Sequence, residues 1–206
     1  MKSVMIASVV LSGMMLAQPH TTAPTDPPAT STPCEAVSQE NAAAIAKPRD
    51  GAQWMDRHEG FNARAKQGAA NGDISLIFLG DSITQGWEGS GKDVWEATYA
   101  KKQAVNFGIG GDRTQHVLYR VQNGNLEGLA TPESGEAPTL LVLMIGTNNS
   151  NGSDHTAEEI AEGITAIVDA VKEKLPKTKI LLLGIFPRGE KPMMDHRRRR
   201  RGRWRA

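Results

Sequence analysis

Three short hydrophobic runs stand out along the chain, and small polar residues follow the first two. The runs are "ISLIFLG" (74–80), "TLLVLMIG" (139–146) and "KILLLGIF" (179–186), with a shorter candidate, "QAVNFG", at 103–108. None of them alternates strictly between hydrophobic and polar positions, which is typical of strands that are covered on both faces. The pattern therefore predicts a parallel sheet.

Helical periodicity follows the second of these runs. From Thr156 onward the hydrophobic positions recur every three or four residues, and Glu159 stands at the spacing of a capping box. Pro176 ends the pattern. The sequence thus predicts a long amphipathic helix between two strands.

Two further helices are expected. One begins at an Asp112 cap, buries Val117, Leu118 and Val121, and ends at Gly124. The other covers about 54–66, before the first strand. Strands that alternate with helices predict a doubly wound α/β fold with right-handed crossovers.

The N-terminus differs in composition from the rest. Lys2 and the apolar run that ends at Ala17 have the length and flanks of a secretory signal peptide, residues 1–17, with an uncleaved membrane anchor as the alternative. Residues 18–45 are rich in Pro, Thr and Ala, which is typical of a disordered linker. We therefore expect a secreted or periplasmic protein whose folded domain spans 46–190.

Charge and cysteine usage restrict the possible partners. Of the 24 basic residues among 206, seven are arginines between Arg197 and Arg205, in a basic tail at 191–206. Without them 17 basic residues face 23 acidic ones, so only the tail favours nucleic acid or an anionic surface. The single Cys34 cannot form an internal disulfide.

Unusual chemistry follows three strands at their carboxyl ends, the edge where ligands bind in such sheets. Asp81 and Ser82 follow the first, the glycine loop "GIGGDRT" the next, and Asn148 the third. Alone, each has a structural explanation: a helix cap, a tight turn or a turn residue. Together they supply an attacking hydroxyl and several hydrogen-bond donors, the groups that acyl transfer requires.

Other known motifs do not fit these segments. Thr84 stands where the G-x-S-x-G elbow of α/β-hydrolases requires glycine, and Arg113 occupies the third glycine position of G-x-G-x-x-G. The lysine and spacing of a Walker phosphate loop are also absent from this segment.

At these residues the sequence resembles the SGNH (GDSL-like) hydrolase superfamily, in the branch of the platelet-activating-factor acetylhydrolase catalytic subunits. The resemblance covers about 54–188 and rests on "GDSI", "NFGIGGDRTQHVLYRVQNG" and "GTNN". It implies a flavodoxin-like three-layer α/β/α fold and ester hydrolysis without a metal or cofactor. It also implies that Ser82 is the nucleophile, that Asp81 supports the turn, and that the oxyanion hole consists of the N–H groups of Ser82 and Gly111 with the side chain of Asn148.

The general base of the superfamily comes from an Asp-x-x-His block after a further strand, and the printed sequence contains none. Its last residues, "MMDHRRRRRGRWRA", read like a shifted frame or a premature end, so we expect the last strand and helix of the fold to be missing. Asp195 and His196 are adjacent, which makes their side chains diverge. We expect His58, His116 and His155 to be surface or packing residues, and the base is left unassigned.

Two functions follow from these observations. The first is a serine esterase that cleaves small acyl esters, acetyl-type esters of lipids or carbohydrates included, through an acyl-enzyme. The second is a non-catalytic binding protein that retains a degenerate hydrolase cleft. The expected partner is a small acyl ester, with no specific nucleic acid and no stable membrane insertion after signal removal. The oligomeric state is left open, although an exposed apolar edge at 179–186 would favour association.

Overall fold

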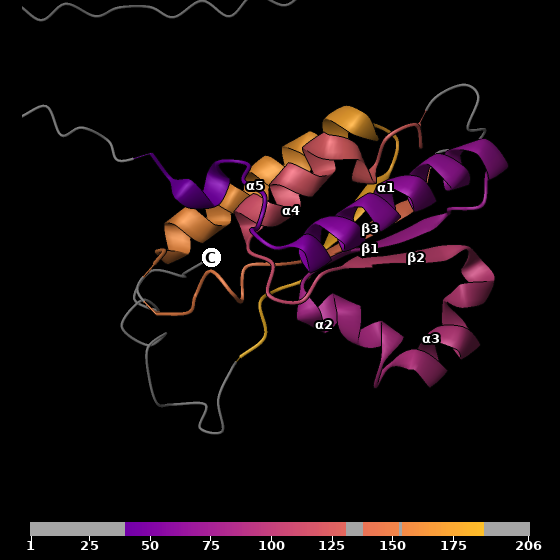
Figure 1. Ribbon diagram of the computed structural model, residues 1–206, viewed down its shortest axis with the longest axis horizontal. Helices are drawn as coiled ribbons and strands as arrows, with labels where there is room; N and C mark the ends of the chain where they lie inside the picture. The colour runs from indigo at the N-terminus through magenta and orange to yellow at the C-terminus, as the bar shows by residue number, and fades with distance from the viewer. Residues whose placement is uncertain (1–39, 131–137, 153, 188–206) are drawn as a thin grey trace, which may run out of the picture. The chain divides into compact units, whose positions relative to one another are not determined.

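The computed structural model describes residues 40–130, 138–152 and 154–187, all within the unit Gln39–Ala206. The proposed signal peptide, most of the linker and the basic tail lie outside these residues. The elements, shown in Figure 1, are η1 (Ala42–Ala44), α1 (Ala52–Asn71), β1 (Leu76–Gly80), α2 (Ser82–Gln85), η2 (Gly86–Glu88), α3 (Lys92–Thr98), η3 (Ala100–Lys102), β2 (Ala104–Gly108), α4 (Thr114–Arg120), η4 (Val121–Asn125), β3 (Leu140–Met144), α5 (Ala157–Lys174) and β4 (Lys179–Leu182).

The four strands form one parallel sheet in the order β2-β1-β3-β4. Each strand lies within one of the hydrophobic runs, so the predicted parallel sheet is confirmed. The order is that of the flavodoxin-like arrangement, in which the chain reverses direction across the sheet between β1 and β3. Gly80, the last residue of β1, lies between Gly108 of β2 and Met144 of β3, so three strands end at one edge.

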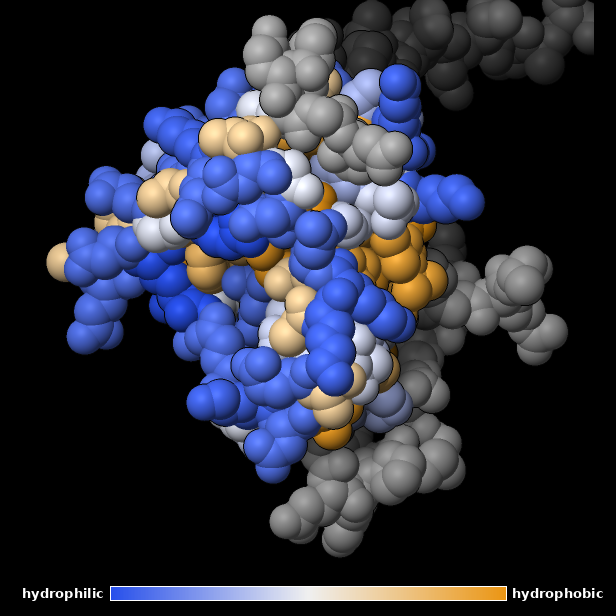
Figure 2. Space-filling view, turned by 90° about the vertical axis from the view of Figure 1, so that its right-hand side faces the viewer, coloured by the Kyte–Doolittle hydropathy of each residue, from blue (hydrophilic) through white to orange (hydrophobic). Residues whose placement is uncertain are grey.

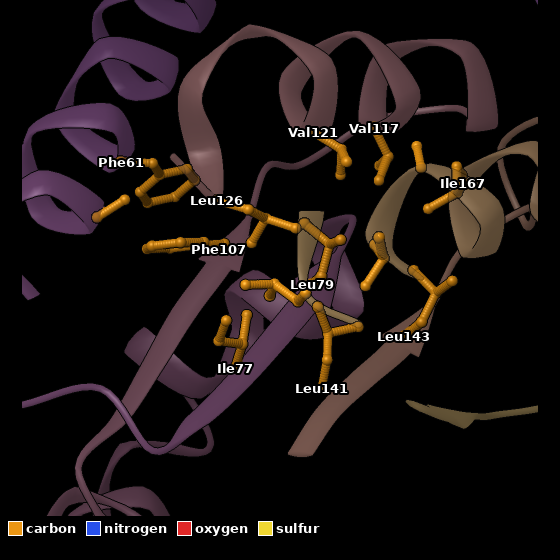
Figure 3. Packing of buried hydrophobic residues seen from close by; sticks show 14 of the residues in the cluster. Phe61, Ile77, Leu79, Phe107, Val117, Val121, Leu126, Leu141, Leu143 and Ile167 are labelled. Atoms are coloured by element: carbon orange, nitrogen blue, oxygen red, sulfur yellow. The ribbon is translucent and has the colours of Figure 1, made fainter. Parts of the chain in front are cut away.

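One face of the sheet carries the main hydrophobic core. Ile77 and Leu79 of β1, with their neighbours on β2 and β3, pack against α1, α4 and α5 (Figure 3). The ring of Phe61 in α1 stacks on Phe107 of β2 with centroids 4.8 Å apart. Burial of this apolar surface is the main term that stabilises the layer.

A cluster of aromatic rings covers part of the opposite face. Phe78 of β1 contacts Trp87, Trp95 and Tyr99, which belong to η2, α3 and the residue after α3. The helices α2 and α3 thus lie across the sheet from α1, α4 and α5 (Figure 1). The predicted three-layer α/β/α arrangement is confirmed, although α3 has no clear signal in the sequence.

Helix α5 begins as its sequence predicts. Thr156 caps it by accepting the N–H of Glu159 at 3.1 Å, and the Glu159 carboxylate accepts the N–H of Thr156 in return. Ile160, Ile167 and Val171 are buried against the core. The predicted capping box and apolar stripe are therefore confirmed.

The segment before α1 packs on α5, although its composition predicts a disordered linker. Asn41 donates its side-chain amide to the carbonyl of Glu159 at 2.9 Å, and Ala43 is fully buried. These contacts place both residues in the folded domain, so the predicted boundary at residue 46 is too late.

Gly163 of α5 gives the first testable prediction. A Cβ at this position would lie 2.4 Å from the carbonyl oxygen of Ala43 and 2.9 Å from the Cβ of Thr114. Gly163→Ala should therefore destabilise the fold by about 1–3 kcal/mol through overpacking. Gly60→Ala is the matched control, because Gly60 lies inside α1 with open space around it, and this change should stabilise by about 0.5–1 kcal/mol. If both variants changed the free energy of urea unfolding equally, the close packing of Gly163 against Ala43 and Thr114 would be contradicted.

The hydrophobic edge predicted at β4 is present in the described residues. Leu181 and Leu182 are 48% and 49% exposed, and β3 is the only described strand that pairs with β4. The side of the molecule seen in Figure 2 is mostly hydrophilic, with its largest hydrophobic patch on the right of the view and smaller ones elsewhere. Within the described residues no helix is both long and apolar enough to span a membrane. The predicted loss of the last strand and helix falls on residues outside this description.

Candidate active site

The turn after β1 presents Ser82 at the start of a short helix. Asp81 is fully buried, and its Oδ1 accepts the N–H of Ile83 at 2.9 Å, so Asp81 caps α2. Ser82 is the first residue of α2 and is exposed. The helix-cap interpretation is therefore correct for Asp81, while Ser82 keeps an accessible hydroxyl.

The glycine loop after β2 lies against this turn. Gly108 approaches α2 closely, since a Cβ there would lie 2.3 Å from the backbone nitrogen of Gln85. A Cβ on Gly110 would lie 3.7 Å from that of Ser82. Gly111 has φ +81°, a left-handed conformation that favours glycine. The glycines thus form a tight turn and also bring bare backbone next to the serine.

Asn148, after β3, connects the other two strand ends. Its Nδ2 donates to the carbonyl oxygen of Asp112 at 2.8 Å and lies 3.4 Å from Oδ2 of Asp81. The structure therefore brings Asp81, Ser82, the glycine loop and Asn148 together at one rim.

The three groups assigned to the oxyanion hole differ in their availability. Within the described residues, the backbone N–H groups of Ser82 and Gly111 donate no hydrogen bond. Both hydrogens of the Asn148 amide, in contrast, have acceptors in the protein. No described residue therefore competes with an incoming oxyanion for these two backbone donors. Asn148 must give up one of its two hydrogen bonds to donate to the oxyanion, and the longer one, to Asp81, is the weaker.

A buried ion pair between Arg120 and Asp112 anchors the glycine loop. Arg120 of α4 is completely buried and donates through Nε to Oδ2 of Asp112 at 2.9 Å. Its other nitrogens donate to the carbonyls of Phe107 and Gly80, at the ends of β2 and β1. Burial raises the pKa of Asp112 and lowers that of Arg120, and their mutual attraction opposes both shifts.

The predicted start of α4 at an Asp112 cap is wrong. The helix begins at Thr114, while the Asp112 carboxylate accepts hydrogen bonds from Arg120 and from Nε1 of Trp54 at 2.8 Å. Leaving a buried guanidinium without a carboxylate partner costs more free energy than leaving a helix end without a side-chain cap. Arg120 itself was the sequence signal for this ion pair. It is a charged residue between the buried Val117 and Val121, and a buried charge needs a partner.

Comparison with known proteins shows the family to which the chain belongs. Residues 78–206, which include all three strand ends, match the GDSL-like Lipase/Acylhydrolase family. The chain belongs to this family. The predicted recognition of a GDSL-like hydrolase is confirmed, and membership supports a hydrolase function.

Relatives of this GDSL-like chain include two human proteins. The chain is 39% identical over 140 residues to platelet-activating factor acetylhydrolase IB subunit alpha2 and 37% identical over 158 residues to subunit alpha1. These matches cover 68% and 75% of the chain but only 54% and 62% of the relatives, so the chain spans little more than half their length. A solved GDSL-like lipase from Bacteroides thetaiotaomicron has a TM-score of 0.43 at 21% identity, over 61% of this chain and 58% of its own.

The described histidines of this GDSL-like chain contact residues other than Ser82. His58 is buried, and its two ring nitrogens lie 3.2 Å and 3.3 Å from the amides of Asn125 and Asn62. Nδ1 of His116 accepts the N–H of Arg113 at 3.0 Å, and His155 is buried. In the part of the chain that the structure describes, none of them is hydrogen-bonded to the Ser82 hydroxyl.

His116 should make the stability of the domain depend on pH. Burial, with a smaller contribution from Arg49 and Arg113, lowers the pKa of His116 from 6.5 to about 4. The unfolded chain therefore takes up this proton below about pH 6.5, while the folded protein resists it until about pH 4. The contribution of His116 to the free energy of unfolding is therefore fully present above pH 6.5 and is lost as the pH falls toward 4.

We expect wild type to lose about 1–2 kcal/mol more than His116→Gln between pH 7 and 5, after allowance for the partial exposure of the ring. Urea unfolding of both proteins at the two pH values measures the difference. Equal losses would show that His116 does not carry this dependence.

A cavity of about 460 Å³ lies beside the glycine loop, between it and the start of α1. Its lining includes Arg49, Trp54, Arg57, Gln85 and Gly110. Among the described residues no group of three His, Cys, Asp or Glu side chains could hold a metal ion. Metal-free hydrolysis stays a prediction of the family resemblance.

Proposed function

We propose that this GDSL-like chain is a serine acylhydrolase that cleaves small acyl esters through an acyl-Ser82 intermediate. The observation that supports it is the shared rim, where the exposed Ser82, the N–H of Gly111, which donates to no described residue, and the amide of Asn148 come from the ends of three adjacent strands. Acetyl-type esters of lipids or carbohydrates are the proposed substrates, because the relatives are named acetylhydrolases.

In the proposed reaction the Ser82 hydroxyl attacks the ester carbonyl carbon and loses its proton to a base. The carbonyl oxygen becomes an oxyanion that accepts hydrogen bonds from the N–H groups of Ser82 and Gly111 and from Asn148. Collapse of this intermediate expels the alcohol, which takes up a proton, and leaves the acyl group on Ser82. Water then attacks the acyl carbon, the bond to Ser82 Oγ breaks, and the acyl group leaves as a carboxylic acid while Oγ takes up a proton and the hydroxyl is regenerated.

The base is the component that the described residues do not supply. No described histidine is hydrogen-bonded to Ser82, and the printed sequence has no Asp-x-x-His block. In a protein of only these residues the proton passes to solvent base, so the reactivity of Ser82 should be low and should rise with pH. The same observation favours the second candidate, a binding protein with a degenerate cleft.

Labelling with a fluorophosphonate separates the two candidates. Intact-mass and peptide analysis should find one adduct, on the peptide that contains Ser82, forming faster at pH 9 than at pH 7. Ser82→Ala should give no adduct at that peptide. A folded wild type that remains unlabelled at Ser82 under both conditions would reject the acylhydrolase and favour the binding protein.

A further inference from the structure

We propose that Arg49 is a positioning residue that fixes the Gly110–Gly111 peptide so that the Gly111 N–H is presented to the oxyanion. This inference rests on the proposed function. Its basis is a single contact: Nη1 of Arg49 donates to the carbonyl oxygen of Gly110 at 2.6 Å. Such a charge-assisted hydrogen bond is stronger than one between neutral groups.

The direction of the Gly111 N–H follows from the planarity of the peptide. The described peptide bonds are all trans, so the carbonyl of Gly110 and the N–H of Gly111 point in opposite directions. Because Arg49 holds the carbonyl, the N–H faces away from Arg49 and donates no hydrogen bond to a described residue. Two consecutive glycines would otherwise let this peptide rotate at little cost.

Arg49 is itself held in place. The same Nη1 lies 3.4 Å from Oδ1 of Asp112, and this carboxylate also accepts hydrogen bonds from Trp54 at Oδ1 and from Arg120 at Oδ2. Gln85 secures the preceding peptide, since its Oε1 accepts the N–H of Gly110 at 2.7 Å. The loop is thus clamped on both sides of Gly110 by side chains that lie outside it.

The contacts favour positioning over direct substrate binding. Arg49 lines the cavity beside the loop, but its charge is already paired with Asp112, and its guanidinium rests against Gly111, where a Cβ would lie 3.1 Å from Nη1. A positioning role predicts slower acylation by any substrate. A substrate-binding role predicts weaker binding of anionic substrates only.

The test uses the full 206-residue chain and three variants. Arg49→Met should lower the rate of fluorophosphonate labelling at Ser82 by about 10-fold to 100-fold, somewhat less than removal of a donor, because the peptide still samples the active orientation. Arg49→Lys, which retains a cationic donor, should restore part of the rate. Arg64→Met is the matched control: Arg64 is 32% exposed against 33% for Arg49, is likewise paired with an aspartate, and should stay within about twofold of wild type.

A second readout does not depend on reactivity. In ¹⁵N-labelled protein the amide signal of Gly111 should broaden or shift in Arg49→Met, remain close to wild type in Arg49→Lys, and be unchanged in Arg64→Met. An unlabelled wild type would reject the proposed function, and the amide signal would still test Arg49. An unchanged Gly111 signal in Arg49→Met, or labelling as fast as in wild type, would overturn the inference.

Discussion

Replacing Asn148 by alanine should slow the acylation of Ser82 by roughly a hundredfold to a thousandfold, the loss typical of removing one donor from an oxyanion hole. The Asn148 amide lies within 3.4 Å of Asp81 and 2.8 Å of the carbonyl of Asp112, so it is fixed at the rim before any substrate binds. The labelling rate of Ser82, compared with wild type at one pH, measures the loss.

The neighbouring Asn149 provides the matched control. It is fully buried, accepts the N–H of Thr114 at 2.9 Å and donates to the side chains of Thr114 and Gln115. Asn149→Ala should therefore lower Tm while the protein that remains folded is labelled at nearly the wild-type rate. If both variants slow labelling equally, or if neither does, Asn148 is not a donor to the reacting group.

Replacing Arg120 by methionine should destabilise the domain by about 3–5 kcal/mol, which corresponds to a loss in Tm on the order of 10 °C. The change leaves the carboxylate of Asp112 buried without its main partner and frees the carbonyls at the ends of β1 and β2. Thermal unfolding followed by circular dichroism measures the effect.

Arg64→Met is the control for this prediction, because Arg64 forms a half-exposed pair with Asp73 at 2.9 Å. Exposed pairs contribute about 0–1 kcal/mol, so this variant should melt within a few degrees of wild type. An Arg120→Met variant that melts as late as Arg64→Met would show that the buried pair does not support the fold.

The sequence predicted those parts of the fold that depend on local pattern. The apolar runs identified β1, β2 and β3 because strands covered on both faces need hydrophobic side chains at almost every position. The run at 179–186 also identified β4, although Leu181 and Leu182 are about half exposed in the described residues. The capping box identified the start of α5 because Thr156 and Glu159 satisfy backbone groups within one turn. The meeting of the three candidate segments at one rim was predictable because each directly follows a strand, while their role in catalysis stays a prediction.

The remaining features depend on contacts between distant residues. Helix α3 has seven residues, and its Trp95 matters through contact with Phe78, which no local pattern reveals. The role of Asp112 was misread because a capping residue and a buried ion-pair partner are the same residue type. Arg49 lies before the region of family resemblance, and only folding brings it to Gly110.

The central claim is that Ser82, Gly111 and Asn148 surround one reacting carbonyl group. A crystal structure of the protein phosphonylated at Ser82 tests it most directly. We expect the phosphonyl oxygen to lie within about 3.2 Å of the backbone nitrogens of Ser82 and Gly111 and of Nδ2 of Asn148, with the contact between Asn148 and Asp81 lengthened. A phosphonyl oxygen that points into solvent, away from Gly111 and Asn148, would contradict it.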